Sequence, residues 1–160
     1  KIFDCFMYFD EEVVLDIRLN TLNDFWLIVI VESKFTHKGD PRNLKFNLKS
    51  FEKFKDKIIY LIYDEIPSEI EKINIEDSYN EQTRKYILNA VHRENEQRNF
   101  IKNGLSSAGN NDLIFISDVD EIPNLSNLNL NKITEKIILF RQDMFYYKFN
   151  LKLPDLIWSG

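Results

Sequence analysis

The chain has 160 residues, of which 44% are hydrophobic, 14% aromatic and 29% charged, a composition typical of one globular domain and unlike a disordered chain. Its 26 acidic and 21 basic residues give a formal net charge of -5, the wrong sign for a protein that binds nucleic acid by neutralising phosphates. The longest apolar run, residues 25–31, is too short to cross a bilayer, which takes about 20 residues of helix.

The first predicted elements are two strands joined by a helix. Residues 1–9 are rich in aromatic side chains and predict a strand, in which Cys5, the single cysteine, is expected to be a buried free thiol. Residues 11–22 predict a helix, because apolar residues and Arg18 recur at helical spacing. Residues 25–32 form a continuous apolar run typical of a strand covered on both faces, so the two strands are expected to pair in parallel.

The alternation of strands and helices continues along the chain. Residues 33–47 are expected to form a loop, residues 47–56 a short helix and residues 57–65 a third strand. Residues 80–105 predict a long helix and residues 112–117 a fourth strand. The long helix carries an apolar stripe at Tyr86, Ile87, Ala90 and Val91. This order predicts a three-layer α/β domain with a mostly parallel central sheet, whose ligands bind beyond the carboxyl ends of the strands. Residues 136–153 alternate imperfectly and predict further strands, with antiparallel pairing as one arrangement.

An acidic cluster follows the fourth strand, in the sequence DLIFISDVDEIPN at residues 112–124. In extended backbone, residues two apart point the same way, so Asp118 and Asp120 are expected to present both carboxylates to one point. Such a pair suits a hard cation such as Mn²⁺ or Mg²⁺, whose remaining ligands are commonly waters and substrate phosphates. The alternatives are an acidic turn that caps a helix and a metal-dependent phosphatase of the Asp-x-Asp type, although that pair normally follows the first strand.

Residues 116–123, ISDVDEIP, resemble the Asp-x-Asp segment of glycosyltransferase family 17, the β-1,4-mannosyl-glycoprotein β-1,4-N-acetylglucosaminyltransferases. Further segments follow the family in order and cover nearly the whole chain: DCFMYFDE (4–11), DIRLNTL (16–22), VIVESKFTHKGDPRNL (29–44), FKDKIIY (54–60), RENEQRN (93–99) and WSG (158–160). Several ordered segments are more specific than an isolated Asp-x-Asp motif.

The resemblance implies a GT-A-like fold with a Rossmann-like nucleotide-binding half in a single domain over residues 1–160. It implies an inverting transfer of N-acetylglucosamine from UDP-GlcNAc to a glycan or glycoprotein, with β-1,4 linkage to mannose. A metal ion, Mn²⁺ or Mg²⁺, would join Asp120 and Asp118 to the donor diphosphate. Such a cation lowers the barrier by stabilising the charge that grows on the leaving group.

Other residues are expected to bind the donor because of their places in the predicted fold. Asp10, Glu11 and Glu32 follow the first two strands, where helix capping and a solvated loop are the competing interpretations. The family resemblance implies that Arg98 and Asn99 face the donor or brace the acids, although Glu94 and Arg98 also have the spacing of an ordinary helical ion pair. Residues 37–38 are further candidates for contact with phosphate or acceptor, whereas His92 is interpreted as structural.

The catalytic base is not identified by the sequence. An inverting transfer needs a carboxylate that accepts the proton of the acceptor hydroxyl, and Glu121, Asp143 and Asp155 are the candidates. Because related enzymes supply this base after the metal strand, we expect the chain to be truncated at its carboxyl end and to lack its acceptor half. A non-catalytic module that binds nucleotide sugars is therefore a further alternative.

The aromatic-rich stretch at residues 144–149 and Trp158 are candidates for stacking on a sugar or for core packing. A cytoplasmic or membrane-peripheral location is expected for a microbial protein, and the Golgi lumen for a eukaryotic member without its anchor.

Overall fold

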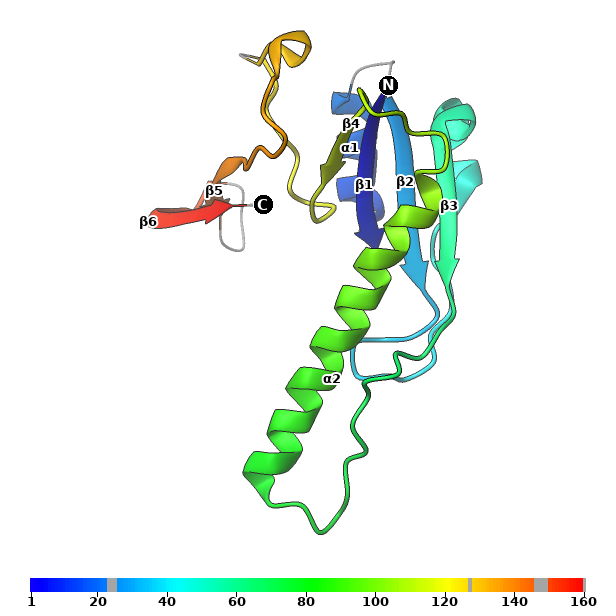
Figure 1. The fold of residues 1–160 in the computed structure, drawn as a ribbon, viewed down its shortest axis with the longest axis vertical. Helices are drawn as coiled ribbons and strands as arrows, with labels where there is room; N and C mark the ends of the chain where they lie inside the picture. The colour runs from blue at the N-terminus through cyan, green and yellow to red at the C-terminus, as the bar shows by residue number, and fades with distance from the viewer. Residues whose placement is uncertain (23–25, 127, 146–149, 160) are drawn as a thin grey trace.

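The computed structural model describes residues 1–22, 26–126, 128–145 and 150–159. Its main sheet has four parallel strands in the order β3-β2-β1-β4, so the predicted parallel pairing of the first two strands is confirmed (Figure 1). The elements up to the acidic cluster are β1 (Ile2–Tyr8), α1 (Glu12–Thr21), β2 (Trp26–Ser33), η1 (Leu48–Lys57), β3 (Ile58–Tyr63), α2 (Tyr79–Asn99), η2 (Phe100–Gly104) and β4 (Leu113–Ile116).

Two apolar cores lie on the two faces of this sheet, so the predicted mixed α/β architecture with a parallel sheet is confirmed. On one face, Phe6 and Ile30 pack with Leu15 of α1 and Phe51 of η1. On the other face, a second cluster of buried residues includes Ile101 of η2 and the strand residues Phe3, Cys5, Val29, Val31 and Tyr63. Successive residues of a strand point to opposite faces, which is why a continuous apolar run in β2 serves both cores.

The free thiol of Cys5 lies in the second core, as predicted. Burial, reinforced by the charge of Asp4, raises the pKa of Cys5 to about 12. The thiol therefore stays protonated and serves as a small apolar side chain.

The helical segments differ from the predictions mainly at their ends. The segment predicted as a short helix at residues 47–56 is the 3-10 helix η1, which contains a non-helical residue at Phe51. The long helix α2 ends at Asn99 and continues as the short 3-10 helix η2. Gly104 closes η2 against the sheet, where an added Cβ would lie 2.5 Å from Val29 Cγ1. The glycine is thus required for the close approach of η2 to β2.

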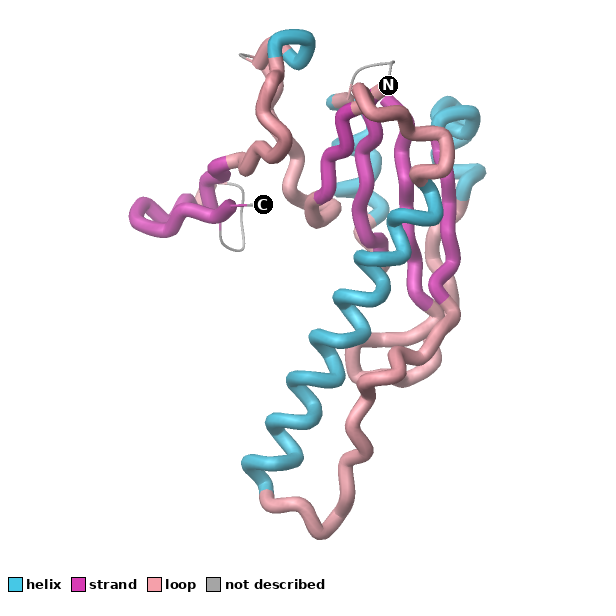
Figure 2. The backbone as a smooth tube through the Cα atoms, viewed as in Figure 1, coloured by secondary structure: helices cyan, strands magenta, loops and turns pink. Residues whose placement is uncertain are grey.

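The amino-terminal part of α2 extends beyond the carboxyl ends of the strands (Figures 1 and 2). The apolar stripe on this helix is exposed: Tyr86 is 53%, Ile87 60% and Val91 43% accessible to solvent. Helical periodicity indicated an apolar face, but the sheet is too short to cover it. Only the final turns of α2 and η2 approach the strands.

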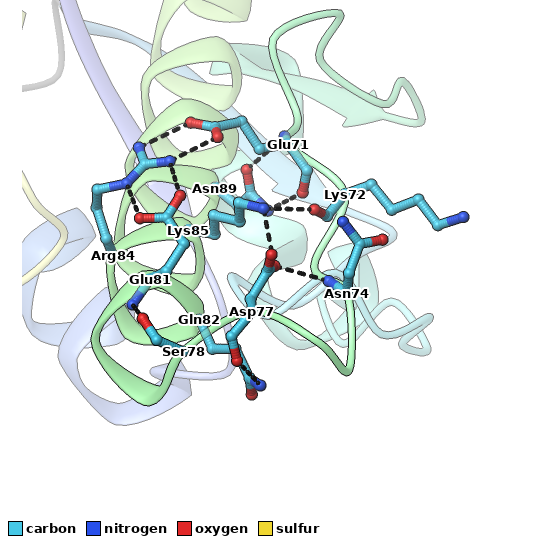
Figure 3. A network of polar contacts seen from close by, with 10 residues as sticks. All are labelled: Glu71, Lys72, Asn74, Asp77, Ser78, Glu81, Gln82, Arg84, Lys85 and Asn89. Carbon is cyan, nitrogen blue, oxygen red and sulfur yellow. Dashed lines mark hydrogen bonds and ion pairs between the residues drawn. The ribbon is translucent and has the colours of Figure 1, made fainter.

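An irregular segment, residues 64–78, leads from β3 to the start of α2 and contacts α2 through a polar network (Figure 3). Arg84 pairs with Glu71 at 2.8 Å and with Glu81 at 2.7 Å, while Lys85 pairs with Asp77 at 2.8 Å. The buried amide of Asn89 donates to the backbone oxygen of Glu71 and accepts from its N–H, both at 2.8 Å. Polar contacts therefore hold the projecting half of α2 to residues 64–78.

The predicted further strands are β5 (Arg141–Phe145) and β6 (Lys152–Ser159), which pair in antiparallel fashion as a separate sheet. The aromatic residues 146–149 lie outside the described part of the chain. Across the described residues, no helix has both the length and the apolar character needed to span a membrane.

Candidate donor and metal site

The acidic cluster lies on a tight turn that begins after β4. Glu121 donates its backbone N–H to the carbonyl oxygen of Asp118 at 3.0 Å, and Asp118 returns its own N–H to Glu121 Oε2 at 2.9 Å. The expectation of extended backbone at Asp118 and Asp120 is therefore wrong, because β4 stops at Ile116. Val119, between the two acids, is buried in the core that α1 covers, and this burial anchors the turn to the core.

Both carboxylates nevertheless line one cleft of about 780 Å³. The cleft lies beyond the carboxyl ends of β1, β2 and β4, where the strand order reverses between β1 and β4 and where open α/β sheets bind ligands. Its walls come from the end of β1, the start of α1, the loop after β2, α2 and the acidic turn: Met7, Tyr8, Phe9, Glu11, Val14, Thr36, His37, Lys38, Asp40, Glu94, Gln97, Asp118, Val119 and Asp120. The fold thus brings residues from distant parts of the chain to Asp118 and Asp120.

The cleft is negatively charged, since acids outnumber basic residues in its lining. Burial, reinforced by neighbouring carboxylates led by Asp10, raises the pKa of Tyr8 to about 12. No three His, Cys, Asp or Glu side chains within the described residues gather closely enough to hold a metal alone. Two carboxylates fit Mn²⁺ or Mg²⁺ when waters and substrate phosphates complete the coordination shell.

Arg98 pairs with Asp118 and with Glu94. Its Nη2 donates to Asp118 Oδ1 at 3.0 Å and to Glu94 Oε1 at 3.1 Å, so both predicted pairings occur together. Arg98 and Asn99 were predicted to act together, but only Arg98 contacts an acid of the cluster. Asn99 is exposed and donates to Glu96 Oε1 at 3.1 Å, and it does not line the cleft.

Of the two acids between β1 and α1, Glu11 lines the cleft and Asp10 does not. The Oε2 atom of Glu11 accepts from the backbone N–H of Phe9 at 2.8 Å and of Asp10 at 3.0 Å. Glu11 is the N-cap residue of α1, yet its side chain bonds to the backbone before the helix. Asp10 is exposed and lies 3.5 Å from Lys45 Nζ.

Glu32 is a buried anchor rather than an exposed ligand. Its Oε1 accepts from Lys45 N at 2.7 Å, while Oε2 accepts from Phe46 N at 3.0 Å and Tyr60 OH at 2.8 Å. Arg42 Nη2 lies 3.1 Å from Oε1 and also donates to the carbonyl of Phe9. The solvated-loop interpretation of Glu32 is therefore wrong, since these contacts satisfy a charge with no solvent exposure.

The loop after β2 carries His37 and Lys38 into the cleft lining. Arg93 on α2 holds this loop by donating to the carbonyl of His37 at 3.0 Å, with its guanidinium packed against Gly39. The ring of His37 packs edge-on against Phe9 with centroids 5.3 Å apart. His92, interpreted from sequence as structural, pairs with Glu69 at 2.9 Å and does not line the cleft.

Of the candidate bases whose side chains are described, neither Glu121 nor Asp143 lines the cleft. Glu121 lines a separate apolar hollow of about 450 Å³ beside β4, and its carboxylate holds the acidic turn. Asp143 belongs to β5 and pairs with Lys152 at 2.7 Å. Asp155 lies in β6, and its side chain, like that of Trp158, is outside the described part of the structure.

Arg18 reaches the acidic turn from below, which sequence reasoning missed. This residue lies on the buried face of α1, pairs with Asp4 of β1 and donates to backbone oxygens of the turn. The available signal was a charge at an apolar position in each element: Arg18 within the helical stripe and Asp4 within an apolar strand. Buried charges of this kind are expected to be paired.

The sequence model of glycosyltransferase family 17 matches residues 1–160. No curated protein and no solved structure matches the chain.

Proposed function

Because the chain belongs to glycosyltransferase family 17, we propose that it transfers N-acetylglucosamine from UDP-GlcNAc to a glycan hydroxyl, with Mn²⁺ or Mg²⁺ held by Asp118 and Asp120. The observation that carries this proposal is that both carboxylates line the cleft at the reversal of strand order. The nucleotide-binding half of a GT-A-like fold would then correspond to the four-stranded sheet.

The residues of the cleft have distinct roles in this proposal. A bound divalent cation would supply charge stabilisation to the departing diphosphate. Asp118 and Asp120 would hold that cation, and Arg98 and Lys38 would attract the anionic donor. Phe9 and the ring of His37 form one wall against which a planar base or a sugar ring can pack.

For the acceptor we propose a glycan hydroxyl, and the family resemblance supports a mannose of a glycoprotein glycan, joined in β-1,4 linkage. Inversion in one displacement needs a base within hydrogen-bond reach of that hydroxyl.

The test is a binding screen of nucleoside diphosphate sugars with and without Mn²⁺, read by calorimetry. We expect UDP-GlcNAc to bind in a Mn²⁺-dependent manner, and Asp120→Asn to abolish this dependence. Asp64→Asn is the matched control, because Asp64 is exposed, lies outside the cleft lining and pairs with Lys34. Undiminished binding by Asp120→Asn would remove the metal role, and hydrolysis of phosphate esters without a sugar acceptor would favour a phosphatase.

A further inference from the structure

A single buried guanidinium contacts the backbone that carries Asp118 and Asp120 at several points. Arg18 donates from Nη1 to the carbonyl oxygens of Asp118 at 2.7 Å, Val119 at 3.1 Å and Glu121 at 3.2 Å. These carbonyls converge on one nitrogen from three positions of a five-residue segment. The turn is therefore wrapped around Arg18.

The remaining donors of Arg18 are also engaged. Nη2 donates to Ser117 Oγ at 2.7 Å and to Asp4 Oδ1 at 2.6 Å, and Nε donates to Asp4 Oδ2 at 2.8 Å. Ser117 Oγ in turn donates to the carbonyl of Glu121 at 3.3 Å. Five N–H groups in a planar fork are specific to arginine, whereas lysine has three donors at one point.

Asp4 makes the arrangement compatible with a neighbouring cation. The side chains of Arg18 and Asp4 are both 0% exposed and form a two-point ion pair. An unpaired buried guanidinium under the turn would repel a divalent cation above it. Paired with Asp4, it shapes the backbone while its own charge is neutralised.

We propose that Arg18 and Asp4 are positioning residues that set the affinity of the Asp118 and Asp120 carboxylates for a divalent cation. This inference rests on the proposed function, since it presumes a cation at that turn. Arg18 fixes the turn from the core side, and the two carboxylates line the cleft on the other side. Groups that orient metal ligands in this way typically change metal affinity by about 10–100-fold when removed.

The experiment measures Mn²⁺ binding to the 160-residue chain by electron paramagnetic resonance, alongside the melting temperature. The double variant Asp4→Leu with Arg18→Met removes both buried charges, a replacement that is often tolerated or stabilising. We expect it to melt near the wild-type temperature and to bind Mn²⁺ roughly 10–100-fold more weakly. A merely structural role predicts a shifted melting temperature with unchanged Mn²⁺ affinity in the folded protein, and that result would overturn the proposal.

Two further variants keep the test decisive if the double variant does not fold. Ser117→Ala removes one contact of Arg18 without exposing a buried charge, and we expect it to weaken Mn²⁺ binding while Ser126→Ala, a control in the following loop, does not. Arg18→Lys keeps the positive charge but loses the planar set of five N–H donors, so it should bind Mn²⁺ more weakly than the wild type. Equal binding by Ser117→Ala and wild type would count against the positioning role, whereas wild-type protein that binds no Mn²⁺ refutes the proposed function itself.

Discussion

Arg98 and Asp118 are joined by a contact of 3.0 Å, from the last turn of α2 to the turn after β4. The same nitrogen of Arg98 lies 3.1 Å from Glu94, so the arginine serves two carboxylates of the cleft lining at once. Both side chains of the Arg98 and Asp118 pair are partly exposed, and surface pairs of this kind add little to stability. The contact is better placed to tune what Asp118 binds.

We predict that Arg98→Gln separates the affinity for metal from the affinity for nucleotide. The substitution removes the guanidinium that competes with Mn²⁺ for the carboxylate of Asp118. Mn²⁺ alone should therefore bind more tightly, by roughly tenfold for about 1.4 kcal/mol of lost repulsion. Uridine diphosphate in the presence of Mn²⁺ should bind more weakly, because a positive charge near the phosphates is gone. Calorimetric titrations with each ligand measure both effects.

Arg84→Gln is the matched control for Arg98→Gln, since Arg84 lies on the same helix, also contacts two acids and is remote from the cleft lining. A parallel fall of both affinities in Arg98→Gln would assign it a bracing role only.

Gly39→Ala is expected to destabilise the loop that carries His37 and Lys38. Gly39 has a φ of 98°, and an added Cβ would lie 2.5 Å from Arg93 Nη2. The substitution therefore combines backbone strain, of about 1–3 kcal/mol, with displacement of the arginine that holds the loop. Thermal melting measures the loss, and Gly109→Ala is the control because its nearest neighbour would be Asp112 Oδ2 at 3.8 Å. Equal melting temperatures for the two variants would show that the loop does not depend on this glycine.

Mild acid is expected to loosen residues 64–78 from α2 before the sheet unfolds. Hydrogen bonds from Arg84 lower the pKa of Glu71 and of Glu81, and a hydrogen bond from Lys85 lowers that of Asp77. Carboxyls with lowered pKa stabilise the folded state above their ordinary pKa of about 4, and this contribution is lost as the pH falls below that value. Amide hydrogen-exchange protection at residues 71–85 should fall between about pH 6 and pH 3, while protection in β1 and β2 persists.

The control for the acid experiment is the double variant Glu71→Gln with Asp77→Asn. We expect it to show low protection at residues 71–85 at both pH values. If protection in the wild type tracks β1 at every pH, the network in Figure 3 does not control this segment.

Truncating one side chain of the exposed apolar stripe of α2 is expected to change the stability of the protein little. Ile87 is 60% exposed, so Ile87→Ala should change the free energy of unfolding by no more than about 0.5 kcal/mol. Ile30→Ala, in the core at 0% exposure, should cost about 2–5 kcal/mol. Urea denaturation compares the two variants. A large cost at Ile87 would mean that the stripe is covered in solution.

The sequence by itself determined the strands, their parallel pairing and the family. The continuous apolar run at residues 25–32 is typical of a strand covered on both faces, and residues 57–65 predicted a third strand. The matching segments along the chain pointed to glycosyltransferase family 17. Asp118 and Asp120 could also be predicted from sequence, because their position directly after an apolar strand is a local property of the chain.

Only the tertiary structure decided what surrounds those acids. The contacts of Arg18 depend on α1 packing against β1 and the turn after β4, and nothing local indicates that its guanidinium meets carbonyls about 100 positions away. Glu32 and Asp118 look alike as acids after strands, yet one is buried among donors and the other is half exposed in a cleft. Periodicity reports which side of an element is apolar, whereas burial depends on whether another element reaches that side, as the exposed stripe of α2 demonstrates.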